Sequence, residues 1–447
     1  MSNHTDKKKF FFPLGNNPWI LYFPFLIAFV CWALISPTNG FSGDEARYLE
    51  YAHNLLNGFY SPPAPNIELI NGPGYPIFLL PFVALGLPLI TITICNAFMY
   101  YISIVVLHKA LLMIVSQRTT LIFSLFWGLY YIAYQGIPFI HTETLTYLLV
   151  VMVIHCLIKS FQQNGTKASV ISIIWCGFFM GYLVLTKMIF GHVLIILIIG
   201  TVILRLIYRN DINIKRLLII LAIALGTTSP YLIYTYRITG KLFYWGNGND
   251  SLYWMTATAP NEYGSWFPNP LEDYDSVYLT YYIPGTGDSL IKYHREDLED
   301  IKQYTGIDKD DAYFRHAIEN IKDHPSKFVE NYIYNVGRFI FQYPFSYGMH
   351  RPKVLIVFPI QGILLTLVLI SLVITLMNWR RVPFPIKFLL FMTLLYCAGS
   401  TVVTAYLRMF TVIVPILVTW IAYMLENAIQ IKLKINPLTQ NKAEDTA

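Results

Sequence analysis

About ten apolar runs, each close to the length of a membrane-spanning helix, follow one another along this chain of 447 residues. The hydrocarbon core of a bilayer is about 30 Å thick, so a helix needs about 20 apolar residues to cross it. The runs cover residues 17–36, 88–114, 119–138, 142–161, 168–186, 188–208, 216–236, 353–377, 384–404 and 407–428. Only 13% of the residues are charged, about half the share in soluble domains. We therefore predict a polytopic α-helical membrane protein with about ten transmembrane helices.

Two apolar segments need separate comment. The stretch 74–87 is shorter than a span and contains Pro76 and Pro81, so we predict an interfacial or re-entrant helix that leads into the next span. Near the N-terminus, three lysines (residues 7–9) precede the first apolar run, and no small-residue cleavage site follows it. We expect this run to be retained as the first span, with its basic flank in the cytoplasm.

Basic residues distinguish the two sides of the membrane. The short loops on one side contain most of them: Lys109, Arg118, Lys159, Lys167, Arg205, Arg209, Lys215, Arg216, Arg380, Arg381 and Lys387, with Lys432 and Lys434 after the last run. The opposite side, apart from one long loop, has only Arg47, Lys187 and Arg408. Lys and Arg concentrate in cytoplasmic loops. We predict a multi-pass protein of the inner or plasma membrane, with both termini cytoplasmic and no nucleic-acid partner.

The charge pattern also suggests a division of the chain. Residues 1–236 form an N-terminal transmembrane module with a first outer loop at 37–87. Residues 237–352 form an extracytoplasmic loop domain, mixed but mostly α. Residues 353–436 supply the C-terminal membrane helices, and 437–447 a cytoplasmic tail.

The second half of the loop domain has helical patterns at 289–304, 308–323 and 324–343. The last places Phe328, Tyr332, Val336 and Phe339 on one face, which is typical of an amphipathic helix at the membrane interface.

Asp44, Glu45, Arg47 and Tyr48 form the most unusual polar group, at the outer end of the first apolar run. One interpretation is a helix start, with two acids in the first turn and an ion pair between Asp44 and Arg47. The other is a site in which Asp44 is the general base for an acceptor hydroxyl and Glu45 orients it or binds a metal. A second polar group, residues 71–76, follows, and we predict that both line the mouth of one catalytic cavity.

Three further polar positions lie on the predicted outer side. Lys187 and Arg408 run against the positive-inside pattern and suit a phosphate; the alternatives are snorkelling of Lys187 and a structural pair of Arg408 with Glu143 or Glu50. Glu143 lies at the start of a predicted span, two residues after His141. It either faces Asp44 across the cavity or belongs to a helix start capped by Thr142.

Aromatic residues are dense early in the long loop, where Tyr244, Trp245, Tyr253, Trp254, Tyr263 and Trp266 occur. They form either an interfacial aromatic belt or a surface that stacks on sugar rings and closes over the acceptor.

Several of these residues resemble motifs of the polyprenyl-phosphate-dependent glycosyltransferases of the C-type (GT-C) fold, which include protein O-mannosyltransferases and lipid A aminoarabinose transferases. The resemblance covers nearly the whole chain in the same order. It consists of Asp44–Glu45–Ala46–Arg47–Tyr48 with Ala52, Leu55, Leu56 and Gly58; Pro73, Tyr75 and Pro76; His141–Thr142–Glu143; Gly246–Asn247–Gly248–Asn249; His324–Pro325–Ser326–Lys327–Phe328; and Tyr406–Leu407–Arg408 with Pro415.

The resemblance implies a sugar donor carried on a lipid phosphate or pyrophosphate and used on the outer, periplasmic face. The residue matching Asp44 is then the base or the acceptor-positioning group, transfer proceeds with inversion, and basic residues bind the donor phosphate. One position departs from the family: a lysine or another strong donor often stands just before the first proline of the second motif, where this chain has Asn71–Gly72–Pro73. Phosphate binding then falls to Arg47, Lys187 or Arg408, or to backbone amides.

We therefore predict a membrane glycosyltransferase that moves a sugar from a polyprenyl-phosphate-linked donor to a hydroxyl of a lipid, polysaccharide or protein. The catalytic candidates are Asp44 and Glu45, and the phosphate ligands are Arg47, Lys187 and Arg408; the cavity residues are Tyr48, Tyr75, His141, Glu143 and Asn247. We predict no required cofactor; a divalent cation bound by Asp44, Glu45 and Glu143 stays an open alternative. The alternative is a transporter or flippase of a lipid-linked sugar, whose charges are expected nearer the membrane midplane.

Overall fold

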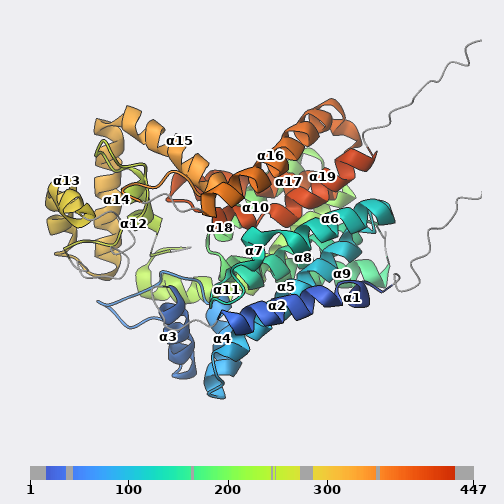
Figure 1. Ribbon diagram of the computed structural model, residues 1–447, viewed down its shortest axis with the longest axis horizontal. Helices are drawn as coiled ribbons and strands as arrows, with labels where there is room; N and C mark the ends of the chain where they lie inside the picture. Colours follow the sequence, from blue (N-terminus) through green and yellow to red (C-terminus); the bar gives the residue numbers. More distant parts are fainter. Residues whose placement is uncertain are drawn as a thin grey trace, which may run out of the picture.

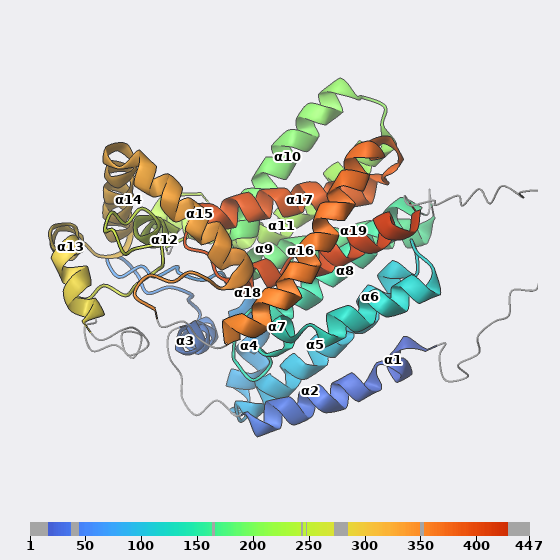
Figure 2. The ribbon, with the colours of Figure 1, turned by 45° about the horizontal axis from the view of Figure 1, so that its top comes forward.

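The computed structural model describes residues 17–36, 44–162, 166–242, 245–246, 248–271, 285–348 and 353–427. Figure 1 shows a body of long helices, with a smaller group set to one side that contains α12 (Gly248–Met255), α13 (Thr286–Ile301) and α14 (Gly306–Asp323). The helix α15 (Pro325–Phe341) leads from this group back to the long helices (Figures 1 and 2).

Seven helices within the described ranges are long and apolar enough to cross a membrane, by length and composition. They are α5 (Ile90–Leu111), α8 (Glu143–Gln162), α9 (Lys167–Thr186), α10 (Ile189–Ile207), α11 (Ile212–Thr239), α16 (Lys353–Met377) and α17 (Phe384–Val402). Several expose large apolar side chains, among them Leu355, Ile363 and Leu376 of α16. Lipid tails would cover such side chains, as the sequence-based prediction of a polytopic helical membrane protein requires.

Three other predicted spans are each divided into two helices. They are α1 (Pro18–Leu21) with α2 (Phe23–Ile35), α6 (Gln117–Leu129) with α7 (Tyr131–Tyr134), and α18 (Leu407–Thr411) with α19 (Val414–Asn427). Pro24 and Pro415 lie in the first turns of α2 and α19, where a proline is tolerated because its missing N–H would have no partner in the same helix. Length alone therefore overestimates the number of uninterrupted spans.

The centre of the long-helix body is α8, which packs against both α5 and α9. In turn α9 packs closely on α11. A Cβ added at Gly177 would lie 2.7 Å from the carbonyl oxygen of Ile220, and one at Gly181 would lie 2.7 Å from that of Ala224. These two glycines, four residues apart, let the helix backbones approach as small residues do in membrane helix pairs.

The first outer loop contains α3 (Asp44–Leu56) and α4 (Gly74–Ala84), which pack against each other. The helix predicted at 74–87 is thus present, and its depth in the membrane stays a prediction. Further contacts of α4 with α9 and α5 hold this loop on the end of the long helices.

The loop domain contains the three predicted helices as α13, α14 and α15. It has a hydrophobic core of its own, made by Tyr253, Trp254, Phe267, Leu290, Leu298, Ile301, Ala312, Tyr313 and Ala317. On the face predicted to be apolar, Phe339 is buried and Phe328, Tyr332 and Val336 are half-exposed; the place of this face at the membrane interface stays a prediction. The fully buried row of α15 is polar and consists of Asn331, Asn335 and Arg338.

Candidate functional site

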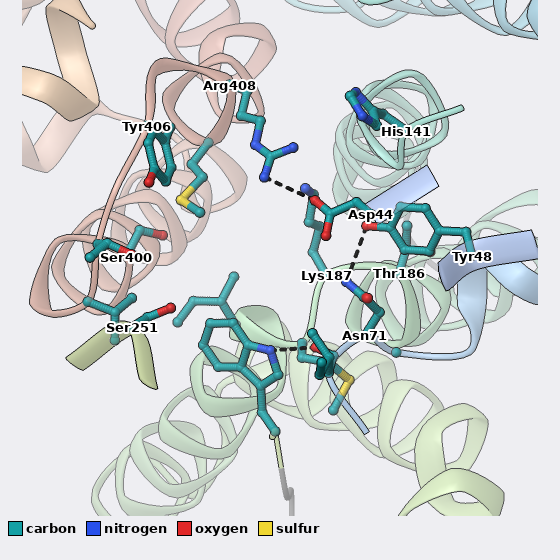
Figure 3. Close-up of a pocket in the computed structure, with 18 of the residues that line it drawn as sticks. Asp44, Tyr48, Asn71, His141, Thr186, Lys187, Ser251, Ser400, Tyr406 and Arg408 are labelled. Carbon is teal, nitrogen blue, oxygen red and sulfur yellow. Dashed lines mark hydrogen bonds and ion pairs between the residues drawn. The ribbon is translucent and has the colours of Figure 1, made fainter. Parts of the chain in front are cut away.

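A cavity of about 500 Å³ opens where α3, the segment 70–72, the end of α9, α12 and the α17–α18 connection meet. Figure 3 shows Asp44, Lys187, His141 and Arg408 on one side of it and Ser251 and Ser400 on the other. Most of its polar and aromatic lining comes from Asp44, Glu45, Arg47, Tyr48, Asn71, His141, Lys187, Trp245, Ser251, Trp266, Tyr396, Ser400, Thr404, Tyr406 and Arg408. The structure thus brings the two polar groups of the first outer loop together with residues far along the chain.

Asp44 lies between two guanidinium groups. Its Oδ1 accepts a hydrogen bond from Nη1 of Arg47 at 3.0 Å. Its Oδ2 accepts one from Nη2 of Arg408 at 3.2 Å, which Figure 3 shows as a dashed line. The ion pair with Arg47 spans one turn of α3, as the i, i+3 spacing predicted. Burial acts to raise the pKa of Asp44, but the charges of Arg408 and Arg47 outweigh it, and the pKa lies below its usual value.

Arg47 has other partners besides Asp44. Its Nη1 also donates to Oδ1 of Asn71 at 3.2 Å, and its Nε lies 3.4 Å from Oε1 of Glu68. Burial raises the pKa of Glu68, against the opposing charge of Arg47. No sequence pattern predicts Glu68 at the site, because it lies in an irregular segment with no periodicity to connect it to α3.

Glu45 occupies a different environment from Asp44. Its side chain is buried, and Oε1 accepts the backbone N–H of Ile140 at 3.0 Å. Although Glu45 contributes to the cavity wall, this hydrogen bond ties α3 to the segment before α8. The contact accounts for a buried acid in the first turn of α3 without a part in the chemistry.

Lys187 and Glu143 form the second ion pair of the site, with Nζ and Oε1 2.9 Å apart. Lys187 follows the last residue of α9 and lines the cavity. Glu143 lies behind it, with only 8% of its side chain exposed, and is not part of the cavity lining. The prediction that Glu143 faces the cavity is therefore wrong, because its carboxylate serves Lys187. The direct partner of Arg408 is Asp44 rather than Glu143 or Glu50.

His141 lines the cavity beside Asp44 (Figure 3) and stacks on the ring of Phe139, with 5.5 Å between ring centroids. Burial lowers the pKa of His141, and the charge of Arg408 lowers it further, against the opposing effect of nearby carboxylates. His141 is therefore neutral at neutral pH and serves as a polar wall rather than as a cation for phosphate.

Tyr48 and Tyr75 are both predicted to line the cavity, but the structure gives them different positions. Tyr48 does line it and accepts a hydrogen bond from Nδ2 of Asn71 at 3.3 Å. Tyr75 lies behind Tyr48 in an edge-to-face contact, with 5.0 Å between ring centroids, and its side chain is fully buried. The cavity prediction for Tyr75 is wrong, since the ring packs in the hydrophobic core that supports Tyr48.

The segment after Asn71 packs directly on the end of α9. A Cβ added at Gly72 would lie 2.2 Å from the carbonyl oxygen of Leu185, and one at Gly74 would lie 2.5 Å from Oγ1 of Thr186. Only glycine allows this approach, which places the segment against the residues that precede Lys187.

The dense aromatic residues of the loop have separate positions. Trp245 and Trp266 line the cavity, and their indole N–H groups donate to Ile70 O at 2.8 Å and to Asp250 Oδ2 at 2.6 Å. Tyr253 and Trp254 lie in the core of the loop domain. Two predicted members of this region, Tyr244 and the cavity candidate Asn247, lie outside the described residues.

The possible metal ligands do not converge. In the part of the chain that the structure describes, no group of three or more His, Cys, Asp and Glu side chains is arranged to hold a metal ion. Asp44, Glu45 and Glu143 have separate partners: two guanidinium groups, a backbone amide and a lysine.

Comparison with known proteins gives two distant structural matches. No family model matches the chain, and no curated protein does. The matching solved structures are crystal structures of ArnT from Cupriavidus metallidurans, one bound to undecaprenyl phosphate and one in the apo state. They have 13% and 14% identity and TM-scores of 0.39 and 0.38, and each match covers 91% of this chain and 77% of the other. Likeness at this level carries no argument about function.

Proposed function

We propose that the protein is a membrane glycosyltransferase that transfers a sugar from a polyprenyl-phosphate-linked donor to an acceptor hydroxyl, with inversion, on the outer face of the membrane. The observation that carries the proposal is the position of Asp44 between Arg47 and Arg408 in a cavity that Lys187 also lines. A carboxylate that can take a proton lies here beside cations that can hold a phosphate, the two groups that this transfer requires.

The position of the cavity along the helices supports action on the outer face. It lies at the C-terminal end of α9, whereas Lys167, at the opposite end of that helix, belongs to the basic loops predicted to be cytoplasmic. The positive-inside rule then assigns the cavity to the side away from the cytoplasm. A sugar donor on that side is most simply delivered on a lipid.

In the proposed reaction, a carboxylate oxygen of Asp44 accepts the proton of the acceptor hydroxyl. The acceptor oxygen forms a bond to the anomeric carbon while the bond from that carbon to the phosphate oxygen breaks on the opposite face. The products are the glycosylated acceptor and the polyprenyl phosphate anion. Arg47, Arg408 and Lys187 stabilise the charge that develops on the leaving phosphate.

The contacts of Asp44 suggest how donor binding prepares the base. In the free protein both guanidinium groups hold the carboxylate and keep its pKa low, which makes Asp44 a weak base. A phosphate competes for the same guanidinium groups and introduces negative charge beside the carboxylate. Arg47 is still held by Glu68 and Asn71 when it turns to the phosphate. Donor binding would therefore free Asp44 and raise its pKa.

The uncharged part of the cavity lining suits a sugar ring. Trp245 and Trp266 offer aromatic faces, and Ser251 and Ser400 offer hydroxyl groups. The hydrogen bonds of both indole groups fix these rings before any ligand arrives, which reduces the entropy lost on binding.

A reconstitution experiment distinguishes this enzyme from a flippase. The purified protein is placed in liposomes that contain a polyprenyl-phosphate-linked sugar, together with candidate acceptors. Release of polyprenyl phosphate that depends on the protein and an acceptor supports the transferase. Movement of intact donor between leaflets, without its consumption, refutes the transferase and supports a flippase.

A further inference from the structure

Two buried side chains of α15 hold the main chain that leads to Arg408. The connection between α17 and α18 is not helical, and it carries Tyr406 directly before α18 begins. Nδ2 of Asn335 donates to the carbonyl oxygens of Thr401 and Val403, at 2.7 Å each. Oδ1 of Asn335 accepts the N–H of Ala405 at 2.9 Å, so one amide group fixes the last turn of α17 and two points of this connection.

Arg338, one turn further along α15, completes the arrangement. Its Nε donates to the carbonyl oxygen of Ala405 at 3.0 Å, three residues before Arg408. Its four other N–H groups donate to the carbonyl oxygens of Tyr263, Gly264 and Pro344 and to Oδ1 of Asn335. All five donors of the guanidinium group are thus used, and both Asn335 and Arg338 have no exposed surface.

We propose that Asn335 and Arg338 are positioning residues for Arg408, and that through them the loop domain sets the geometry of the donor-phosphate site. This inference rests on the proposed function, in which Arg408 binds the donor phosphate. Hydrogen bonds between buried polar groups are costly to break because the separated groups have no water to bond to. The connection is therefore held rigidly with respect to α15, and a shift of about 1 Å at Arg408 is enough to weaken catalysis.

The same helix also binds the main chain of the loop domain. Asn331, one turn before Asn335, donates to the carbonyl oxygens of Met255 and Ala257 at 3.2 and 2.8 Å. Arg338 binds Tyr263 and Gly264, which lie just before the cavity residue Trp266. The α15 helix thus connects the loop segment that carries Trp266 to the main chain that leads to Arg408.

The test is a double-mutant cycle on ligand affinity. The full chain is purified in lipid nanodiscs, and the binding of undecaprenyl phosphate is measured for Asn335→Ala, Arg408→Ala and the double variant. We expect each single variant to bind about tenfold more weakly, because each removes the same charge-assisted contact to the phosphate. The double variant should bind no more weakly than Arg408→Ala alone, because Asn335 acts through Arg408.

Asn331→Ala is the matched control. Asn331 is an asparagine on the same face of the same helix, equally buried, but its hydrogen bonds go to the loop domain and not to the connection. It should lower the unfolding temperature about as much as Asn335→Ala and leave the affinity for undecaprenyl phosphate unchanged. Should Asn335→Ala not fold, Asn335→Asp is the second variant: it retains the acceptor for Ala405, replaces the two donated hydrogen bonds by a carboxylate oxygen that repels the carbonyl oxygens of Thr401 and Val403, and has Arg338 as its counter-ion.

The outcomes separate this inference from the proposed function. Full additivity in the double variant, or equal weakening by Asn331→Ala, overturns the positioning role of Asn335. If Arg408→Ala itself binds undecaprenyl phosphate as tightly as the wild type, the assigned phosphate site is wrong, whatever Asn335 does. Non-additive loss with an unaffected control supports the inference.

Discussion

Asp44→Asn tests the base and the competition for the guanidinium groups in one variant. The substitution keeps the shape of the side chain and removes the negative charge between Arg47 and Arg408. Arg47 keeps its contacts with Glu68 and Asn71, so we expect the local fold to remain. The variant lacks a base at the site and also lacks the group that a phosphate must displace. Turnover and phosphate affinity should therefore change in opposite directions.

The magnitudes follow from the exposure of the two ion pairs. The side chains of Asp44 and Arg408 are 29% and 43% exposed, so each pair contributes no more than about 1 kcal/mol. Removal of both competing contacts should strengthen the binding of polyprenyl phosphate by up to about 2 kcal/mol, or roughly thirtyfold. Loss of a general base should lower the rate of transfer by about 10²- to 10⁴-fold. The free energy of unfolding should fall by no more than about 2 kcal/mol, because the same two pairs are lost.

Three measurements on the protein in nanodiscs decide the matter: binding of undecaprenyl phosphate, single-turnover release of polyprenyl phosphate from a lipid-linked sugar, and thermal unfolding. Glu50→Gln is the control, since Glu50 is exposed on the same helix and loses the same charge. The assignment of the base is refuted if Asp44→Asn transfers sugar at more than about a tenth of the wild-type rate. Weaker binding of undecaprenyl phosphate to Asp44→Asn refutes the competition.

Three further predictions follow. Lys187→Met should bind undecaprenyl phosphate about tenfold more weakly and lose about 2–3 kcal/mol of stability, because it leaves Glu143 buried without its cation. Lys187→Met combined with Glu143→Gln should recover the stability, measured by thermal unfolding, but not the affinity for undecaprenyl phosphate. The acid limb of kcat should lie at higher pH than that of kcat/KM, because the pKa of Asp44 is lowered by Arg408 and Arg47 only while the phosphate is absent; coincident limbs in the two pH profiles contradict the release of Asp44. Gly72→Ala should lower the free energy of unfolding by about 1–3 kcal/mol, since its Cβ would lie 2.2 Å from the carbonyl oxygen of Leu185. An unchanged unfolding temperature contradicts that close packing.

The sequence predicted those parts of the site that local spacing or membrane topology determines. The Asp44–Arg47 pair follows from i, i+3 geometry on a helix. That Lys187 and Arg408 lie at the same end of the membrane helices as Asp44 follows from the charge asymmetry of the loops. Their convergence on one cavity was predicted because a donor phosphate needs cations and these two lie on the predicted outer side; the structure places both residues on the cavity wall with Asp44.

Other parts depend on packing that no local pattern reports. Lys187 follows the end of α9 and Glu143 begins α8, so the ion pair between them depends on how these two helices pack. Glu68 lies in an irregular segment and meets Arg47 only after the first outer loop has folded.

The polar face of α15 was missed for a different reason. Amphipathic analysis looks for apolar rows, whereas Asn331, Asn335 and Arg338 form a polar row that main-chain carbonyl groups satisfy. Side chains that bind backbone groups of another segment leave no periodic signal in the sequence of that segment. The same holds for Tyr75, whose place behind Tyr48 follows from ring packing between α3 and α4.

The departure from the family pattern before Pro73 has a physical explanation in the packing of Gly72. The resemblance led us to look for a cation at this position, where the chain has a glycine. Any side chain at this position would collide with the backbone of Leu185, so the glycine brings the end of α9 against the outer loop. Lys187 follows directly and reaches the cavity from there, held by Glu143. A cation, Lys187, is therefore present near the second motif, but it comes from the end of another helix. The glycine allows that helix end to approach the motif. On this reasoning a lysine introduced by Gly72→Lys does not restore the arrangement of the resembling family: it displaces the end of α9 and, with it, Lys187, the proposed phosphate ligand.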